Sequence, residues 1–193
     1  MFATNITKEE INQLRLDKYN GVIELIDDIT KVKQAFKEIN KFDYSGFDTE
    51  SKPVFVKGQF NDISLVQIAT ADKAYLFRIH LTGITDEMIA YFKNDKHLKI
   101  GVGLRDDIIG LQKISPFKAG GFVELNEIVN KINIEANGLR KLTAIILGFR
   151  ISKNAQVSNW EAPELSKKQE IYAATDAWVC YEMYQRLLAL NIK

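Results

Sequence analysis

Hydrophobic and polar positions change their spacing several times along the chain, and each change marks an expected element. Near the start, Thr7 and Glu10 have the spacing of a capping box, which predicts a short helix through about residue 16. A short apolar run at 22–25 predicts a strand. Asp28 can then cap a helix whose apolar positions recur at intervals of three and four residues. These positions are Val32, Ala35, Phe36 and Ile39.

The middle of the chain has the pattern typical of β-strands. Apolar segments bounded by polar turns predict strands at 44–50, 54–57, 63–69 and 74–78. After a predicted helix at 86–94, the apolar run at 98–102 is short enough for a buried parallel strand. The remaining segments predict helices at 105–113, 125–132, 139–147 and 167–190. Antiparallel strands followed by alternating helix and strand indicate a mixed α/β sheet with helices on both faces.

Composition narrows the class of protein. The 193 residues are 46% hydrophobic and carry a net charge of +1, which favours one folded domain over a disordered chain. Nucleic acid would therefore have to bind in a local groove rather than through an overall positive field. The single cysteine, Cys180, excludes an internal disulfide. With no signal-peptide core and no apolar run near the ~20 residues of a membrane span, we expect a soluble, cytoplasmic protein.

Two acidic residues, Asp48 and Glu50, interrupt one of the predicted strands. Side chains two residues apart on a strand point the same way, so both carboxylates lie on one face, with Gly46 leaving room beside them. Adjacent carboxylates repel each other unless a cation lies between them. An exposed sheet edge would explain the pair without any function. The flanking Phe47 and the apolar strands that follow instead indicate a central strand.

A third acidic residue, Asp107, follows the predicted strand at 98–102. It comes three residues after Leu104 and four before Leu111, so helical spacing places it on the apolar stripe. Asp106 instead aligns with Lys113 on the solvent side. A favourable interaction with the helix dipole is enough to explain Asp106. It leaves the inward position of Asp107 unexplained.

An aspartate and a tyrosine one turn apart lie on the apolar face of the last predicted helix. Tyr172 and Asp176 share helical spacing with Val179, Cys180, Met183 and Leu187. A helical tyrosine is more often a packing residue, but its place one turn before an inward aspartate favours a functional role. Carboxylates that converge from separate segments suit hard divalent cations such as Mg²⁺ or Mn²⁺. The pattern therefore indicates phosphate chemistry.

Taken in order, these segments resemble the tyrosine-bearing branch of the DEDD superfamily of 3′→5′ exonucleases (DnaQ-like). The first two motifs of that branch correspond to residues 46–50 and 101–107, and the third to 158–160 leading through Gln169 to 172–177. The resemblance runs from about residue 21 to about residue 188. The exonuclease domain of the Werner syndrome protein and its stand-alone relatives are the most similar members. Ribonuclease D is a more distant one.

The resemblance implies a ribonuclease H-like α/β fold, with a mixed sheet of five to six strands flanked by helices on both faces. It implies an exonuclease domain at 21–193, preceded by an N-terminal helical extension at 1–20. It also implies two divalent cations, Mg²⁺ or Mn²⁺. Their ligands, and the residue that orients the attacking water, would be the catalytic residues. The expected ligands are Asp48, Glu50, Asp107 and Asp176, and the water-orienting residue is Tyr172.

The expected activity on this resemblance is metal-dependent hydrolysis at the 3′ ends of nucleic acid, with DNA favoured over RNA and nucleoside 5′-monophosphates as products. The substrate would be a single-stranded end or a recessed duplex, and a separate helicase or polymerase is a possible partner. Basic residues before the third motif suggest a phosphate-binding groove, although solvated helix faces often look the same. The expected substrate-binding residues are Thr49, Arg140, Lys141 and Lys153.

Other functions fit parts of the sequence. Gly101 and Gly103 after a strand suggest a dinucleotide-binding turn, but the third glycine of that fingerprint is replaced by Asp106, which would repel a pyrophosphate. A catalytically inactive nucleic-acid- or protein-binding domain on the same fold remains an alternative, because fold does not fix function. Ribonuclease D-like processing of RNA 3′ ends is another.

Overall fold

The fold is built on one mixed sheet. The computed structural model describes residues 2–54 and 58–192, and within them six strands follow the order β1-β4-β3-β2-β5-β6. The strands are β1 (Val22–Ile26), β2 (Tyr44–Ser51), β3 (Ile63–Ala69), β4 (Lys73–Phe77), β5 (Leu98–Gly101) and β6 (Phe122–Glu124). β3 is antiparallel to both of its neighbours, and the other pairs are parallel. This topology confirms the predicted mixed α/β sheet.

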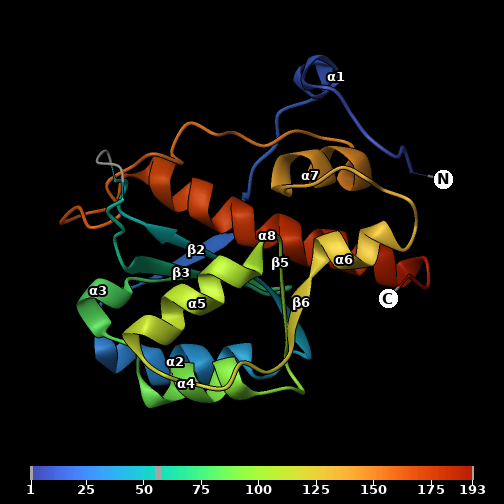
Figure 1. Cartoon of the computed structure of the whole chain (residues 1–193). Coiled ribbons are helices and arrows are strands. Elements are labelled where there is room, and N and C mark those ends of the chain that lie inside the picture. Colours follow the sequence, from blue (N-terminus) through green and yellow to red (C-terminus); the bar gives the residue numbers. More distant parts are fainter. Residues whose placement is uncertain (1, 55–57, 193) are drawn as a thin grey trace.

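Helices cover both faces of the sheet. They are α1 (Lys8–Gln13), α2 (Ile29–Ile39), α3 (Ile79–Thr82), α4 (Asp86–Lys93), α5 (Leu104–Ile114), α6 (Leu125–Asn130), α7 (Leu139–Leu147) and α8 (Lys167–Ala189). Figure 1 shows α2, α4 and α5 on one face and α6, α7 and α8 on the other. Each face buries its own apolar clusters. No helix in the described ranges combines the length and apolar character that crossing a membrane requires.

Most predicted elements are present, with local corrections. The helix predicted through residue 16 ends at Gln13, because Leu14 adopts an extended backbone and Leu16 pairs with Arg150. The short elements α3 and β6 were not predicted, since three or four residues carry too little periodicity to be recognised. The prediction of a strand at 54–57 falls mainly on residues 55–57, which lie outside the described residues.

One glycine determines how closely the longest helix approaches the sheet. Gly46 on β2 faces α8, and a Cβ at this position would lie 1.9 Å from the carbonyl oxygen of Ala177. Only a residue without a side chain allows the two backbones to pack at this distance. The close contact brings the middle of α8 directly over β2, where the predicted acidic residues lie.

Candidate active site

The central strand and the longest helix supply three of the acidic residues. β2 pairs with β3 on one side and β5 on the other, which confirms that Asp48 and Glu50 lie on a central strand. Asp176 is buried on α8, the helix that packs closely against β2 at Gly46. All three residues line one cavity of about 700 Å³, together with Tyr172. The structure therefore brings the first and third predicted motifs together.

Asp107 approaches from the other side of β2. It is half-buried on α5 between the buried Leu104 and Leu111, whereas Asp106 is exposed, as the helical spacing predicted. The Thr49 hydroxyl donates a hydrogen bond to Oδ1 of Asp107. Asp107 lines a neighbouring cavity of about 440 Å³, to which Thr49 and Glu50 also contribute. Thr49 thus joins the second motif to the first.

Burial raises the pKa values of these carboxyl groups, and for Asp48 and Glu50 the charges of the other acids raise them further. Burial is the main cause for each, and it raises the pKa of Glu50 to about 9, of Asp176 to about 7 and of Asp107 to about 6. The pKa of Asp48 is raised well above its usual value by burial and by the charges of Asp107, Asp176 and Glu50. The cluster therefore has a deficit of positive charge.

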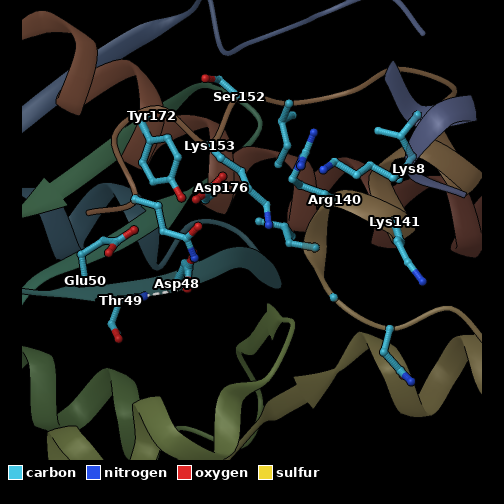
Figure 2. Close-up of a pocket in the computed structure, with 16 residues that line it drawn as sticks. Lys8, Asp48, Thr49, Glu50, Arg140, Lys141, Ser152, Lys153, Tyr172 and Asp176 are labelled. Atoms are coloured by element: carbon cyan, nitrogen blue, oxygen red, sulfur yellow. Dashed lines mark hydrogen bonds between the residues drawn. The ribbon is translucent and has the colours of Figure 1, made fainter. Parts of the chain in front are cut away.

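Tyr172 points its hydroxyl toward this cluster (Figure 2). Burial and the nearby charges of Asp176 and Glu50 raise the pKa of the phenol, so the hydroxyl keeps its proton at neutral pH. The interaction of the hydroxyl with the Asp176 carboxylate partly offsets the rise in the pKa of Asp176. Its ring packs against Trp160 at 6.0 Å between centroids. Packing fixes the ring while the hydroxyl faces the acids.

Trp160 is a supporting residue to which the sequence pattern assigned no separate role. The side chain is completely buried, and its indole nitrogen has no hydrogen-bond partner of normal geometry among the described residues. The indole N–H nevertheless lies near the Glu50 carboxylate and slightly lowers the pKa of that group. Its position in the third motif was the available signal. A buried donor aimed at a metal-ligand candidate suggests that Trp160 orients Glu50.

A basic wall faces the acids across the cavity. Figure 2 shows Lys8, Arg140 and Lys141 on the side opposite Asp48, Glu50 and Asp176. The cavity lining also includes the other two residues predicted to bind substrate, Thr49 and Lys153. Lys8, from α1, is the addition that sequence reasoning missed. The capping box at Thr7 located its helix but could not show that this helix lines the cavity opposite the acids.

The donor set fits divalent cations. Its ligands are all carboxylates, hard oxygen donors, and their raised pKa values show that protein groups do not neutralise their charge. Within residues 2–54 and 58–192, however, no three acidic, histidine or cysteine side chains are already closed into a metal cage. Cys180 is buried beneath the cluster with its thiol pKa raised, which keeps it protonated and disfavours it as a nucleophile or metal ligand.

Sequence comparison connects this site to known proteins. A profile described as 3′-5′ exonuclease matches residues 23–190. The bifunctional 3′-5′ exonuclease/ATP-dependent helicase WRN of Mus musculus is 31% identical over 151 residues, covering 75% of this chain and 11% of that protein. Exonuclease 3′-5′ domain-containing protein 2 of Drosophila melanogaster is 26% identical, covering 92% of this chain and 30% of that protein. The chain therefore spans less than a third of either relative's length.

Solved structures share the fold. The Nibbler EXO domain of Aedes aegypti has a TM-score of 0.79 at 23% identity, covering 92% of this chain and 95% of that chain. The complex of Trypanosoma brucei RNase D with RNA U12 has a TM-score of 0.78 at 18% identity, covering 88% of this chain and 63% of that chain. The sheet order, the helices on both faces and these structures agree on a ribonuclease H-like fold. With the profile match over most of its length, the chain belongs to the 3′-5′ exonuclease family of hydrolases.

Proposed function

We propose that this chain is an active, metal-dependent 3′→5′ exonuclease that removes nucleoside 5′-monophosphates from the 3′ ends of nucleic acid, with DNA preferred over RNA. The observation that carries the proposal is the arrangement of the cavity. Carboxylates with raised pKa values, of which Asp176 is buried and Asp48 and Glu50 are half-buried, lie on one side of it and basic side chains on the other. A phosphodiester can be held by the basic side while its scissile bond faces the acids.

The carboxylates of Asp48, Glu50, Asp107 and Asp176 would hold two divalent cations. When bound, these cations lower the pKa of a water molecule and stabilise the entering and leaving oxygens of the phosphodiester. Asp48, Glu50 and Asp176 face the cavity that a strand would enter. Asp107 contributes from the other side of β2. The hydrogen bond that it accepts from Thr49 fixes the orientation of its carboxylate relative to β2.

Tyr172 supplies a proton donor that stays neutral. Because its phenol remains protonated at neutral pH, its hydroxyl can hold a water molecule in line for attack without adding negative charge to the site. The basic residues Arg140, Lys141 and Lys153 hold substrate phosphates, and the guanidinium of Arg140 is suited to bidentate contact. Thr49 helps to set the position of the 3′ end.

Processing of RNA 3′ ends is the second candidate function. The related fold of Trypanosoma brucei RNase D was solved in complex with RNA U12, so this fold accommodates RNA in that protein.

Mus musculus WRN carries a helicase activity in the same chain, as its name states. We propose that a duplex substrate would reach this site with the help of a separate helicase or polymerase.

The test is hydrolysis of end-labelled substrates by purified protein. Single-stranded and recessed DNA and RNA, labelled at either end, are incubated with Mg²⁺ or Mn²⁺. We expect stepwise shortening from the 3′ end, release of 5′-monophosphates and complete loss of activity with EDTA. Activity that survives exhaustive chelation would overturn the assignment of metal ligands. Absence of hydrolysis with all acids intact would favour an inactive binding domain.

A further inference from the structure

The N-terminal segment, residues 2–20, contributes to the cavity although it lies outside the family match at 23–190. Lys8 and Ile11 of α1 line the cavity that contains the acids. Three following residues line a second cavity of about 390 Å³, which shares Ser152 and Tyr172 with the first. They are Leu16, Asp17 and Lys18. The segment therefore lines both of the cavities that Tyr172 borders, and we call it the N-terminal wall.

Hydrogen bonds hold this wall against the rest of the domain. The backbone nitrogen of Asp17 donates to the Arg150 carbonyl at 2.9 Å, and the backbone nitrogen of Arg150 donates to the Arg15 carbonyl at 2.9 Å. Nε of Arg150 donates to the carbonyl of Leu14 at 3.0 Å. Near the end of the segment, the backbone nitrogen of Tyr19 donates to Oγ1 of Thr175 on α8 at 3.0 Å. A loosely attached tail would not show this set of buried and paired contacts.

Lys8 is the charged residue that the N-terminal segment contributes to the cavity with the acids. Within the described residues, its ammonium has no carboxylate within ion-pair distance. It lies on the side of the cavity that holds Arg140 and Lys141, across from the acids. Lys141 also reaches the N-terminal segment, because its Nζ donates to Oδ1 of Asn5 at 3.4 Å. Three basic side chains from α1 and α7 thus line one side of the site.

We propose that the N-terminal segment is a substrate-binding element, in which Lys8 contacts a backbone phosphate of the strand whose 3′ end reaches the acids. Arg150 is a positioning residue that holds the segment in place. The proposal rests on the proposed nuclease function for the identity of the ligand. It assigns the substrate grip to a part of the chain that the family match does not include. A phosphate contact by an exposed lysine contributes to affinity through counterion release and carries no base specificity.

The test is binding of a fluorescein-labelled single-stranded oligonucleotide, followed by anisotropy in EDTA at a series of NaCl concentrations. The variants are Lys8→Gln and a matched control, Lys37→Gln, which changes an exposed lysine of α2 on the opposite face of the sheet. For Lys8→Gln we expect affinity about fivefold weaker at low salt and a slope of log Kd against log salt smaller by about 0.7. The control should bind like the native chain. With Mg²⁺, KM for the oligonucleotide should rise more than kcat falls.

A second variant tests the positioning role. Arg150→Lys removes the contact from Nε to Leu14 while keeping the charge, so it should weaken binding without changing the salt slope, and a melting curve shows whether the domain remains folded. Equal Kd values and slopes for Lys8→Gln and Lys37→Gln would overturn the proposal. Failure of the native chain to hydrolyse any substrate with Mg²⁺ would instead contradict the proposed function. The binding result in EDTA would still decide the role of Lys8.

Discussion

At the scale of single residues, side chains that are close in the sequence differ in their surroundings or in their chemistry. Asp107 is half-buried and accepts a hydrogen bond from Thr49, whereas Asp106, one residue earlier, is exposed. Tyr172 and Asp176 are one helical turn apart, yet one offers a neutral hydroxyl and the other a carboxylate. Substitutions of these residues therefore separate the chemical roles proposed for the site.

Asp107→Asn should reduce nuclease activity far more than Asp106→Asn. The amide keeps the size of the side chain but removes a charge that holds a cation. Changes even to the groups around metal ligands commonly cost about 10–100-fold, so the loss should be at least that large. Activity is measured with Mg²⁺ on a 3′ single-stranded substrate, and melting curves check that both variants are folded. Equal losses in two folded variants would contradict the assignment of Asp107 to the site.

Tyr172→Phe and Asp176→Asn should fail in different ways. Asp176→Asn removes a ligand, so Mn²⁺ affinity measured by calorimetry and turnover should both fall sharply. Tyr172→Phe keeps the packing of the ring against Trp160 and removes only the hydroxyl. Turnover should then fall by about 10²-fold, the lower end of the effect of positioned proton donors, while Mn²⁺ affinity changes little. Full turnover in Tyr172→Phe across pH would show that Tyr172 only packs.

At the scale of elements, the site depends on how closely α8 lies against β2. Gly46 sets this distance, because the carbonyl of Ala177 occupies the space that a Cβ would need. Asp48 lies two residues after Gly46, and Asp176 is the residue before Ala177. A change in the distance between the two elements therefore changes the separation of the two carboxylates.

Gly46→Ala should weaken both the fold and the activity. The added methyl group has to push α8 away from β2, and overpacking of this kind costs about 1–3 kcal/mol of unfolding free energy. We expect a lower urea midpoint with an unchanged slope and a weaker affinity for Mn²⁺. Gly58→Ala is the matched control, because a Cβ at Gly58 would meet no described atom within 4 Å, although the positive φ there imposes a small strain of its own. Native Mn²⁺ affinity in a folded Gly46→Ala variant would show that the spacing of the elements does not set the site.

Much of this element layout could be predicted from the sequence because long periodic segments decide it. The strand with Asp48 and Glu50, the phase of α5 and the inward face of α8 all follow from the spacing of apolar residues. Contacts between distant segments do not. The wall formed by residues 2–20 depends on pairing with Arg150, and no periodicity records this contact. Lys99 is a similar case: it is fully buried on β5 because three backbone carbonyls accept from its ammonium.

At the scale of the whole molecule, the buried acids act against the stability of the metal-free protein. The pKa of Glu50 is about 9 in the folded chain, compared with 4.5 for an ordinary glutamate, and the pKa of Asp176 is about 7 compared with 3.8. The folded state therefore binds more protons than the unfolded state between these values. Its stability is greatest below the ordinary pKa values and is lost as pH rises through the folded ones.

We therefore expect the melting temperature of the metal-free protein to fall as pH rises from 6.5 to 9. Burial lowers the pKa of His97 from 6.5 to about 4 and that of Lys99 from 10.5 to about 8, so both bind fewer protons folded than unfolded. They oppose the fall, His97 near pH 6.5 and Lys99 above pH 8. Each kcal/mol lost corresponds to about 2–4 °C for a chain of this size. Mg²⁺ should raise the melting temperature most at the alkaline end, and Glu50→Gln should flatten the profile. If the melting temperature of the metal-free native chain did not change with pH, the raised pKa values of the acid cluster would be contradicted.

β2, which carries Asp48 and Glu50, and the N-terminal wall, residues 2–20, should open to solvent at different rates. β2 has a strand on each side, so its amide protons can exchange with solvent only when the sheet comes apart. Residues 2–20 are hydrogen-bonded to Arg150, Thr175, Glu135 and Ala136 but belong to no sheet, so these contacts can break while the sheet stays intact. Mild urea should therefore release the N-terminal wall before it disturbs the acids. Under such conditions the enzyme would hold its substrate less tightly and still cleave whatever strand it holds.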